Sequence, residues 1–126
     1  MKVAVVGSRS INSYEVVKAI LTQYTFTQVV SGGAKGVDTL AEQYSDEFHL
    51  EKPLVILPNW KRYNRGAGAI RNLEIVDKSD FVIAIWDGKS KGTVISINYA
   101  KEQHKAVYVW LVEANHFKLI DSHGAA

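Results

Sequence analysis

The sequence predicts a single α/β domain, in which a mostly parallel sheet of about five strands carries helices on both faces. Short, nearly continuous apolar runs recur along its 126 residues, as is typical of strands buried on both faces of a parallel sheet. Apolar residues at helical spacing fill the intervals, and strands that alternate with helices form βαβ units. The expected strands are Val3–Val6, Thr27–Val30, Leu54–Leu57, Phe81–Ile85 and Ala106–Leu111.

The segments between these runs are expected to form helices with one face against the sheet. A last apolar run, His116–Asp121, follows a Glu113-Ala114-Asn115 turn and could pair antiparallel as an extra edge strand. We therefore expect one domain over residues 1–121 and a short tail over residues 122–126. The residues at helical spacing are Val16, Val17, Ile20, Leu21 and Tyr24; Leu40, Tyr44 and Phe48; Ile70, Leu73, Val76 and Asp77; and Ile97, Ala100 and His104.

Composition excludes several classes of protein and of site. With 47% hydrophobic and 22% charged residues, the chain has the balance of a globular protein rather than a disordered or fibrous one. It has no cysteine, which excludes disulfides, zinc–thiolate sites and iron–sulfur clusters. Its histidines show no ligand spacing, so we expect no metal and no required cofactor. No signal peptide or membrane-spanning stretch is visible, and we expect a cytoplasmic protein without a membrane partner.

The segments that follow the expected strands are rich in glycine and in basic residues. Ligands of an open α/β sheet bind outside the carboxyl ends of the strands, where these segments should meet. Glycine lets a backbone approach a ligand, and helix N-termini and positive side chains bind phosphate. We therefore predict that the chain binds a nucleotide or a nucleotide-derived phosphate ligand. The predicted ligand-binding residues are Gly7, Ser8 and Arg9 after the first strand; Ser31, Gly32, Gly33, Ala34, Lys35, Gly36 and Asp38 after the second; Trp60, Arg71 and Asn72 after the third; and Trp86, Gly92 and Thr93 after the fourth.

Each of these features also has a purely structural interpretation. The Ser31–Asp38 loop is rich in glycine, but tight turns between a strand and a helix use glycine freely, and Asp38 could cap the helix. The spacing in this loop matches neither the P-loop nor the dinucleotide-binding fingerprint. Trp60 and Trp86 could each stack on a base or pack within the fold. Both interpretations stay open at the level of the sequence.

One combination of motifs is more specific than any of its parts: Gly7-Ser8-Arg9, Ser31–Ala41, Trp60, Ala67–Asn72, Ser79-Asp80 and Gly92-Thr93. It resembles the SLOG superfamily, the Rossmann-like group that joins the DNA-processing protein DprA to the LOG phosphoribohydrolases, and within it the small YspA-like branch. The resemblance covers roughly residues 1–111. It implies a Rossmann-like fold with a nucleotide-derived ligand in the cleft. In that comparison Ser31–Gly36 would cradle phosphate, and Gly92-Thr93 would match the Gly-Thr of the LOG phosphate loop.

One departure from the pattern bears on activity. LOG-like hydrolases and the similar deoxyribosyltransferases have a catalytic glutamate three residues after the threonine that matches Thr93, and this chain has Ser96 there. A serine cannot supply the carboxylate that steadies an oxocarbenium-like transition state. An enzyme of this kind would need a relocated carboxylate, for which Glu74 and Asp38 are the candidates, and we lean toward a protein without this activity.

The sequence leaves three functions open. The main hypothesis is a small sensor or sequestering module for a nucleotide-derived ligand, and the second is a nucleotide phosphoribohydrolase or deoxyribosyltransferase. The third is single-stranded DNA binding like that of DprA, which the basic and aromatic segment Trp60–Arg65 suggests although the net charge is only +2. The resemblance also implies a homodimer formed through helices beside the cleft, and the last helix has an apolar bias in Val94, Ile95, Ile97 and Tyr99.

Overall fold

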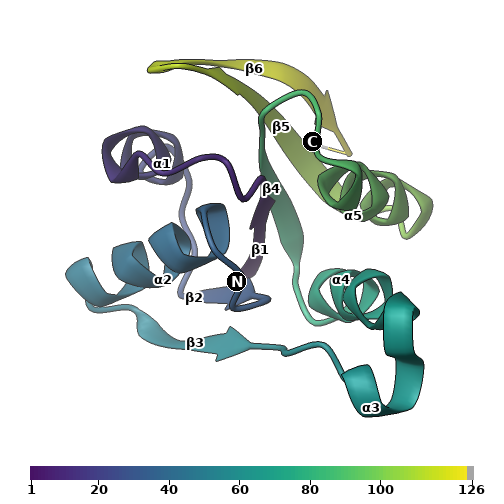
Figure 1. The fold of residues 1–126 in the computed structure, drawn as a ribbon. Coiled ribbons are helices and arrows are strands. Elements are labelled where there is room, and N and C mark those ends of the chain that lie inside the picture. The colour runs from purple at the N-terminus through teal and green to yellow at the C-terminus, as the bar shows by residue number, and fades with distance from the viewer. Residues whose placement is uncertain (125–126) are drawn as a thin grey trace.

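The computed structural model describes residues 1–124. Its strands are β1 (Lys2–Gly7), β2 (Gln28–Ser31), β3 (Glu51–Val55), β4 (Phe81–Trp86), β5 (Ala106–Glu113) and β6 (His116–His123). Its helices are α1 (Tyr14–Leu21), α2 (Val37–Glu47), α3 (Trp60–Tyr63), α4 (Ala67–Asp77) and α5 (Lys91–Glu102), with a 3-10 turn, η1 (Asn64–Gly66), between α3 and α4. The strands form one sheet in the order β3-β2-β1-β4-β5-β6, in which only β6 is antiparallel to its neighbour (Figure 1). The predicted α/β fold is confirmed.

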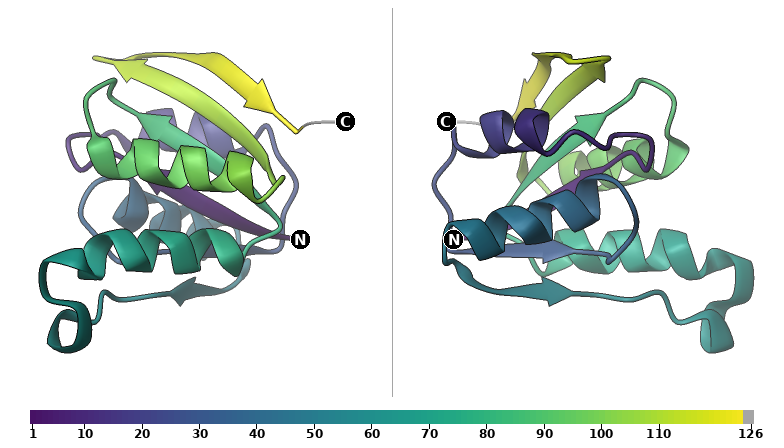
Figure 2. Two further views of the ribbon diagram at one scale, coloured as in Figure 1. Left: turned by 90° about the vertical axis from the view of Figure 1, so that its right-hand side faces the viewer. Right: turned by 60° about the vertical axis from the view of Figure 1, so that its left-hand side comes forward.

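Helices cover both faces of the sheet, as Figures 1 and 2 show. Successive side chains of β1 point to opposite faces. Val3 and Val5 pack with residues of α1 and α2, whereas Ala4 and Val6 pack with residues of α4 and α5. Because the central strands are buried on both faces, their sequences are continuously apolar, and this is why they could be located from the sequence.

The third strand does not lie where the apolar run predicted it. The run covers Leu54–Leu57, whereas β3 covers Glu51–Val55. β3 is an edge strand, and Glu51 and Lys52 are exposed at its start. An edge strand does not need an apolar residue at every position, so the apolar run did not include its polar start. Leu57 lies beyond the strand and is 69% exposed.

The C-terminal strand is antiparallel, as expected, and longer than expected. β6 pairs with β5 from Glu113–His116 to Val107–His123. Residues 122 and 123, which we had assigned to a tail, therefore belong to the sheet, and residues 125–126 of that tail lie outside the described residues. Within residues 1–124, no helix has both the length and the apolar character needed to cross a membrane.

The strand order creates a crevice at the carboxyl ends of β1 and β4. The chain leaves β1 toward α1 on one face of the sheet and leaves β4 toward α5 on the other face. Such a topological switch point is where open α/β sheets bind their ligands. The loops after β1, β2 and β4 and the first turns of α4 meet at this point.

Candidate functional site

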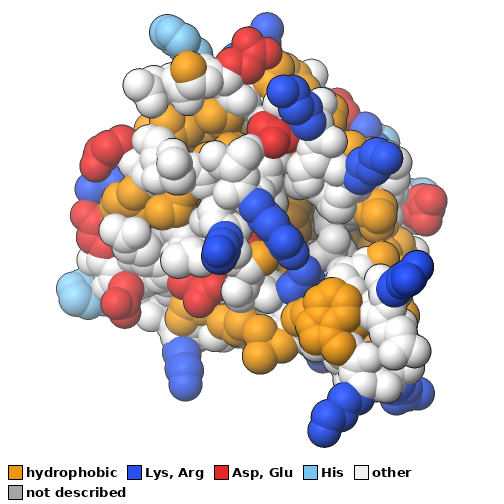
Figure 3. Space-filling view, in the orientation of Figure 1, with side chains coloured by type: hydrophobic (Ala, Val, Ile, Leu, Met, Phe, Trp, Pro, Cys, Tyr) orange, Lys and Arg blue, Asp and Glu red, His pale blue; other side chains and the backbone are white. Residues whose placement is uncertain are grey.

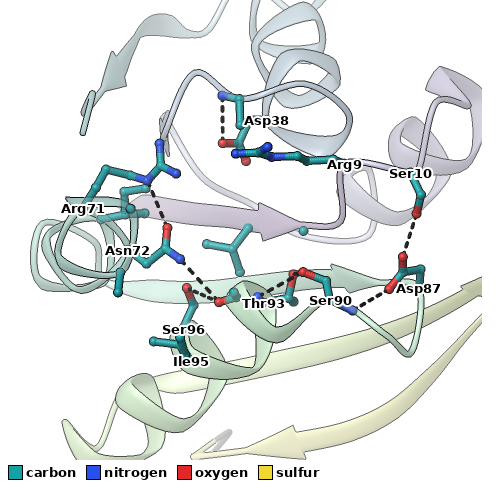
Figure 4. A pocket seen from close by; sticks show the side chains of 17 residues that line it. Arg9, Ser10, Asp38, Arg71, Asn72, Asp87, Ser90, Thr93, Ile95 and Ser96 are labelled. Atoms are coloured by element: carbon teal, nitrogen blue, oxygen red, sulfur yellow. Dashed lines mark hydrogen bonds between the residues drawn. The ribbon is translucent and has the colours of Figure 1, made fainter. Parts of the chain in front are cut away.

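A cleft of about 520 Å³ opens at the switch point. It lies between the loops after β1 and β2 on one side and α4 and α5 on the other (Figure 4). Its lining is mostly polar side chains and small residues, with Val6, Ile75 and Ile95 as the larger apolar ones. The lining residues, here called the cleft, are Val6, Gly7, Arg9, Ser10, Ala34, Asp38, Gly68, Ala69, Arg71, Asn72, Ile75, Asp87, Ser90, Gly92, Thr93, Ile95 and Ser96.

Two of the predicted glycines bring the loops together and leave no room for a side chain. A Cβ on Gly7 would lie 2.4 Å from the Ile85 carbonyl oxygen, and a Cβ on Gly36 would lie 2.5 Å from the Ser8 carbonyl oxygen. Gly36 also has a φ of +76°, a conformation that favours glycine. The loops after β1 and β2 therefore touch through their backbones. The close approach of the backbone is therefore sufficient to explain why glycine stands at these two positions.

Asp38 fixes the shape of the glycine-rich loop from inside the cleft. One carboxylate oxygen accepts hydrogen bonds from the backbone N–H groups of Gly32 and Ala34, each at 3.2 Å. The side chain is only 8% exposed. Burial raises the pKa of Asp38 to about 6, although the two N–H groups and the charge of Arg71 act in the opposite direction. Asp38 is thus a buried acid that changes charge close to neutral pH.

Arg71 and Asn72 connect the glycine-rich loop to the start of α5. The Arg71 guanidinium donates to the Gly32 carbonyl oxygen at 2.7 Å and to the Asn72 side-chain oxygen at 3.0 Å. The Asn72 amide then donates to the Gly92 carbonyl oxygen at 3.4 Å. The pKa of Arg71 lies below its ordinary value, mainly because the side chain is partly buried. The nearby charge of Asp38 raises this pKa, and the charge of Arg9 lowers it. Arg9 is therefore close enough for its charge to act on the Arg71 guanidinium.

Among the described residues, Arg9 and the N-terminus of α5 present hydrogen-bond donors to the cleft that have no partner in the protein. Arg9 is exposed, and within residues 1–124 its side chain takes part in no hydrogen bond or ion pair. Ser90 caps α5 by accepting from the Thr93 N–H at 3.4 Å, which leaves the N–H groups of Lys91 and Gly92 without an intrahelical partner. In Figure 4, Arg9 extends from the loop after β1 toward Asp38 and Arg71, and the start of α5 lies below them. The space between them suits an anion.

Asp87 holds the loop between β4 and α5 in place. One of its oxygens accepts from the N–H groups of Lys89 and Ser90 at 2.8 and 2.9 Å, and the other accepts from the Ser10 hydroxyl at 2.7 Å. Burial raises the pKa of Asp87, but these hydrogen bonds outweigh burial and lower it to about 2. Ser10 and Ser90 were missed at the sequence level. For Ser90 the signal was an aspartate with a serine three residues later, directly after a strand, which is a turn that the Asp side chain closes; Ser10 had no such signal, because its partner Asp87 is 77 residues away.

The structure places half of the sixteen predicted ligand-binding residues in the cleft: Gly7, Arg9, Ala34, Asp38, Arg71, Asn72, Gly92 and Thr93. The other predicted residues lie around it. Ser31 is buried and donates to Glu42 at 3.0 Å, and Ser8 is buried and accepts from the Asp87 N–H at 3.0 Å. Trp86 packs against the core, and its indole N–H donates to the Ser90 carbonyl oxygen at 3.0 Å. Outside the lining are Ser8, Ser31, Gly32, Gly33, Lys35, Gly36, Trp60 and Trp86.

Of the two candidate catalytic carboxylates, Asp38 lines the cleft and Glu74 does not. Glu74 is exposed on α4 and does not line the cleft, because Arg71, Asn72 and Ile75 occupy the face of the helix that does. Asp38 lines the cleft, but two backbone N–H groups already bond to it. Ser96 does face the cleft, and its hydroxyl donates to the Gly92 carbonyl oxygen at 3.4 Å. Within residues 1–124, no cluster of three or more acidic or histidine side chains could hold a metal.

An exposed aromatic and basic segment borders the cleft at the α4 side. Trp60 is 57% exposed, and its ring edge lies 4.0 Å from where a Cβ on the cleft residue Gly68 would be. Lys61, Arg62 and Arg65 follow, all of them exposed. Figure 3 shows Lys and Arg side chains gathered at the centre of this face and around its lower right corner, with a large apolar surface between them. The cleft thus continues outward onto an apolar and positively charged surface.

Comparison with known proteins finds similarity at the level of the fold. The sequence matches no protein family, and no curated protein matches it. DNA processing protein A (DprA) from Streptococcus pneumoniae superposes with a TM-score of 0.67 at 20% identity, over 86% of this chain and 49% of that one. DprA from Helicobacter pylori, in a structure that concerns the single-stranded DNA binding mode of that protein, superposes with a TM-score of 0.66 at 22% identity, over 98% of this chain and 69% of that one.

The chain therefore has a Rossmann-like fold similar to that of DprA. It spans about half, 49%, of the length of the S. pneumoniae protein. The fold that the resemblance implied is therefore confirmed. Nothing in these comparisons concerns the YspA-like branch.

Proposed function

We propose that this domain, with its DprA-like fold, binds single-stranded DNA, and that the cleft holds a backbone phosphate between Arg9, Arg71 and the N-terminus of α5. The observation that carries the proposal is the set of unused donors around the cleft, which are the exposed guanidinium of Arg9 and the free N–H groups at the start of α5. Guanidinium groups and helix N-termini both recognise phosphate oxygens.

The surface beside the cleft favours a polynucleotide over an isolated anion. Trp60 presents an exposed ring next to the cleft residue Gly68, and exposed Lys61, Arg62 and Arg65 follow it in the chain. Bases stack on exposed aromatic rings, while basic residues follow the backbone, which is how many proteins bind single strands. The likeness to DprA, one of whose structures concerns single-stranded DNA binding, supports the same conclusion.

The first test measures binding of a fluorescent oligothymidylate by anisotropy. Arg9→Ala removes donors that no other described residue uses, so we expect unchanged thermal stability and an affinity at least tenfold lower, since a charge-assisted hydrogen bond contributes about 1.5–3 kcal/mol. Lys52→Ala is the matched control. It removes one exposed positive charge at the start of β3, at the opposite end of the strand from the cleft. Equal affinity of both variants would contradict the proposed site.

Gly92→Ala supplies a second probe of the same cleft. A Cβ on Gly92 would lie 3.5 Å from the Asn72 amide nitrogen, an ordinary contact, so the fold tolerates the methyl group. Alanine in the first turn of a helix also raises the free energy of unfolding slightly. We expect DNA affinity to fall while thermal stability stays equal or rises. Unchanged affinity would place the phosphate elsewhere.

A nucleotide-derived small molecule is the second candidate ligand. The cleft volume of about 520 Å³ favours it, because small-molecule sites commonly measure about 300–1,000 Å³. Competition separates the two ligands: a mononucleotide or ADP-ribose that raises thermal stability and displaces the oligonucleotide at micromolar concentration would make the small molecule the natural ligand. Ser96 gives no support to a hydrolase.

Self-association stays a prediction. Of the four apolar residues on α5 that suggested it, Ile97 is buried in the core and the Tyr99 hydroxyl donates to Asp77 on α4 at 2.7 Å. Ile95 is 41% exposed and lines the cleft. A dimer formed through α5 would therefore bring its partner close to the ligand.

A further inference from the structure

A second cavity, of about 340 Å³, adjoins the cleft on the side away from Trp60. Ser10 and Asp87, which are joined by a 2.7 Å hydrogen bond, line both cavities and form the wall between them. The second cavity lies between the loop after β1 and the turn that joins β5 to β6. The cavity itself could not be predicted from the sequence, because the two segments are about 100 residues apart and only the fold brings them together.

The charges around this cavity exclude a phosphate from it. Among the described residues that line it there is no Lys or Arg, and Asp87 is the one charged residue. The hydrogen bonds from Ser10, Lys89 and Ser90 keep that carboxylate negative. Glu15 adds a second negative charge in the first turn of α1, which begins at the cavity. These negative charges disfavour an anionic group in the cavity.

The remaining lining side chains indicate which kind of chemical group fits the second cavity. Ile11 and Val112 are buried and give the cavity an apolar base. Asn12 and Asn115 border it from the two opposite segments, and within residues 1–124 neither side-chain amide makes a hydrogen bond. Each amide offers a donor and an acceptor side by side. Apolar surface combined with paired donors and acceptors matches a nucleobase, and asparagine pairs in this way with the N6 and N7 atoms of adenine.

We infer that the second cavity is a base subsite, which receives the nucleobase attached to a phosphate held in the cleft and contacts its edge through Asn12 and Asn115. The inference rests on the proposed function, because the cleft supplies the phosphate. It adds a direction to that function: the nucleic acid crosses from Trp60, over the cleft, to the β5–β6 turn. A base then lies on each side of the bound phosphate.

The test compares two probes of the same length and charge. One is a fluorescent tetramer of deoxyadenylate, and the other is a tetramer of abasic deoxyribose phosphates. We expect the double variant Asn12→Ala/Asn115→Ala to bind the adenine tetramer roughly tenfold more weakly than the unmodified protein does and to bind the abasic tetramer equally well. Asn98→Ala is the control, because Asn98 is an exposed asparagine on α5 outside both cavities. Thermal unfolding of all variants checks that the fold is retained.

The outcomes distinguish the inference from the function on which it rests. If the unmodified protein binds neither tetramer, the proposed function fails. If it binds the adenine tetramer and the double variant binds that tetramer equally well, or loses affinity for both probes alike, the base subsite is wrong and the cleft proposal survives. A second measurement needs no variant: adding dAMP should shift the NMR signals of the Asn12 and Asn115 side-chain amides and leave that of Asn98 unchanged. Absence of those shifts at saturation would also overturn the subsite.

Discussion

Asp38 links the shape of the site to pH. Its carboxylate holds the N–H groups of Gly32 and Ala34 and faces the Arg71 guanidinium, with Glu42 as a further nearby charge. Burial raises its pKa from the ordinary 3.8 to about 6, so the folded protein favours the protonated acid. The stability that Asp38 contributes is therefore complete below about pH 4 and is lost as the pH rises through about 6.

The corresponding prediction concerns Asp38→Asn. Asparagine keeps an acceptor for the backbone N–H groups and never becomes charged, so the free energy of unfolding at pH 7 should exceed that of the unmodified protein by up to about 3 kcal/mol. The difference should disappear near pH 4. Urea denaturation at several pH values measures it, and an advantage that persists at pH 4 would contradict the assignment.

The same titration predicts a pH dependence of DNA binding. Oligothymidylate should bind more tightly at pH 5.5 than at pH 7.5, because the neutral acid no longer competes for Arg71.

Residue identities alone could not separate ligand contacts from packing contacts. Gly7, Gly36 and Gly92 are equally permissive in the sequence, but the first two are enclosed by backbone atoms and only Gly92 faces the cleft with space around it. The same holds for the tryptophans: Trp86 packs beneath the loop and Trp60 is exposed. These distinctions depend on neighbours that are distant in the chain.

At the scale of elements, burial decides what the sequence could predict. β1 and β4 are covered on both faces, so continuous apolar runs marked them. β3 is an edge strand with exposed Glu51 and Lys52, and the predicted strand began three residues too late, at Leu54 instead of Glu51. The short helix α3 has no buried residue and left no apolar pattern at all. The rule that ligands bind at the carboxyl ends of strands nevertheless located the cleft, because it depends on topology and not on exact boundaries.

The α3 helix yields a prediction of its own. Its N-cap is Asn59, whose side-chain oxygen accepts from the Arg62 N–H at 3.2 Å. Loss of an N-cap costs about 1 kcal/mol, but here the cost falls on a helix that buries nothing in the core. Asn59→Ala should therefore leave the melting temperature nearly unchanged, speed amide hydrogen exchange in α3 and weaken DNA binding by releasing Trp60.

Asn59→Ser is the matched control for this change, because serine is as good an N-cap as asparagine. It should preserve both slow exchange and affinity. A melting temperature that falls substantially in Asn59→Ala and not in Asn59→Ser would show instead that α3 supports the core.

At the scale of the whole molecule, the distribution of charge matters more than its sum. The net charge is only +2, from 15 Lys and Arg against 13 Asp and Glu. Eight of those 15 basic residues follow β1 to β4 or line the cleft; among the acids, Asp38 and Asp87 line the cleft and Glu15 lies in the first turn of α1 after β1. The basic residues concerned are Arg9, Lys35, Lys61, Arg62, Arg65, Arg71, Lys89 and Lys91. The end of the sheet at which the parallel strands finish is therefore strongly positive, although the whole molecule is nearly neutral (Figure 3).

This asymmetry predicts how DNA binding depends on salt. A single strand that places about three phosphates on this edge should give a slope of about −2 for log Kobs against log salt concentration, or roughly fifteenfold weaker binding at 200 mM than at 50 mM salt. Arg9→Ala should make the slope shallower by about 0.7, whereas Lys52→Ala, far from the cleft, should leave it unchanged. Anisotropy titrations across that salt range measure both effects. A slope near zero in the unmodified protein would mean that no backbone is followed, and the cleft would then serve a single small nucleotide rather than a strand.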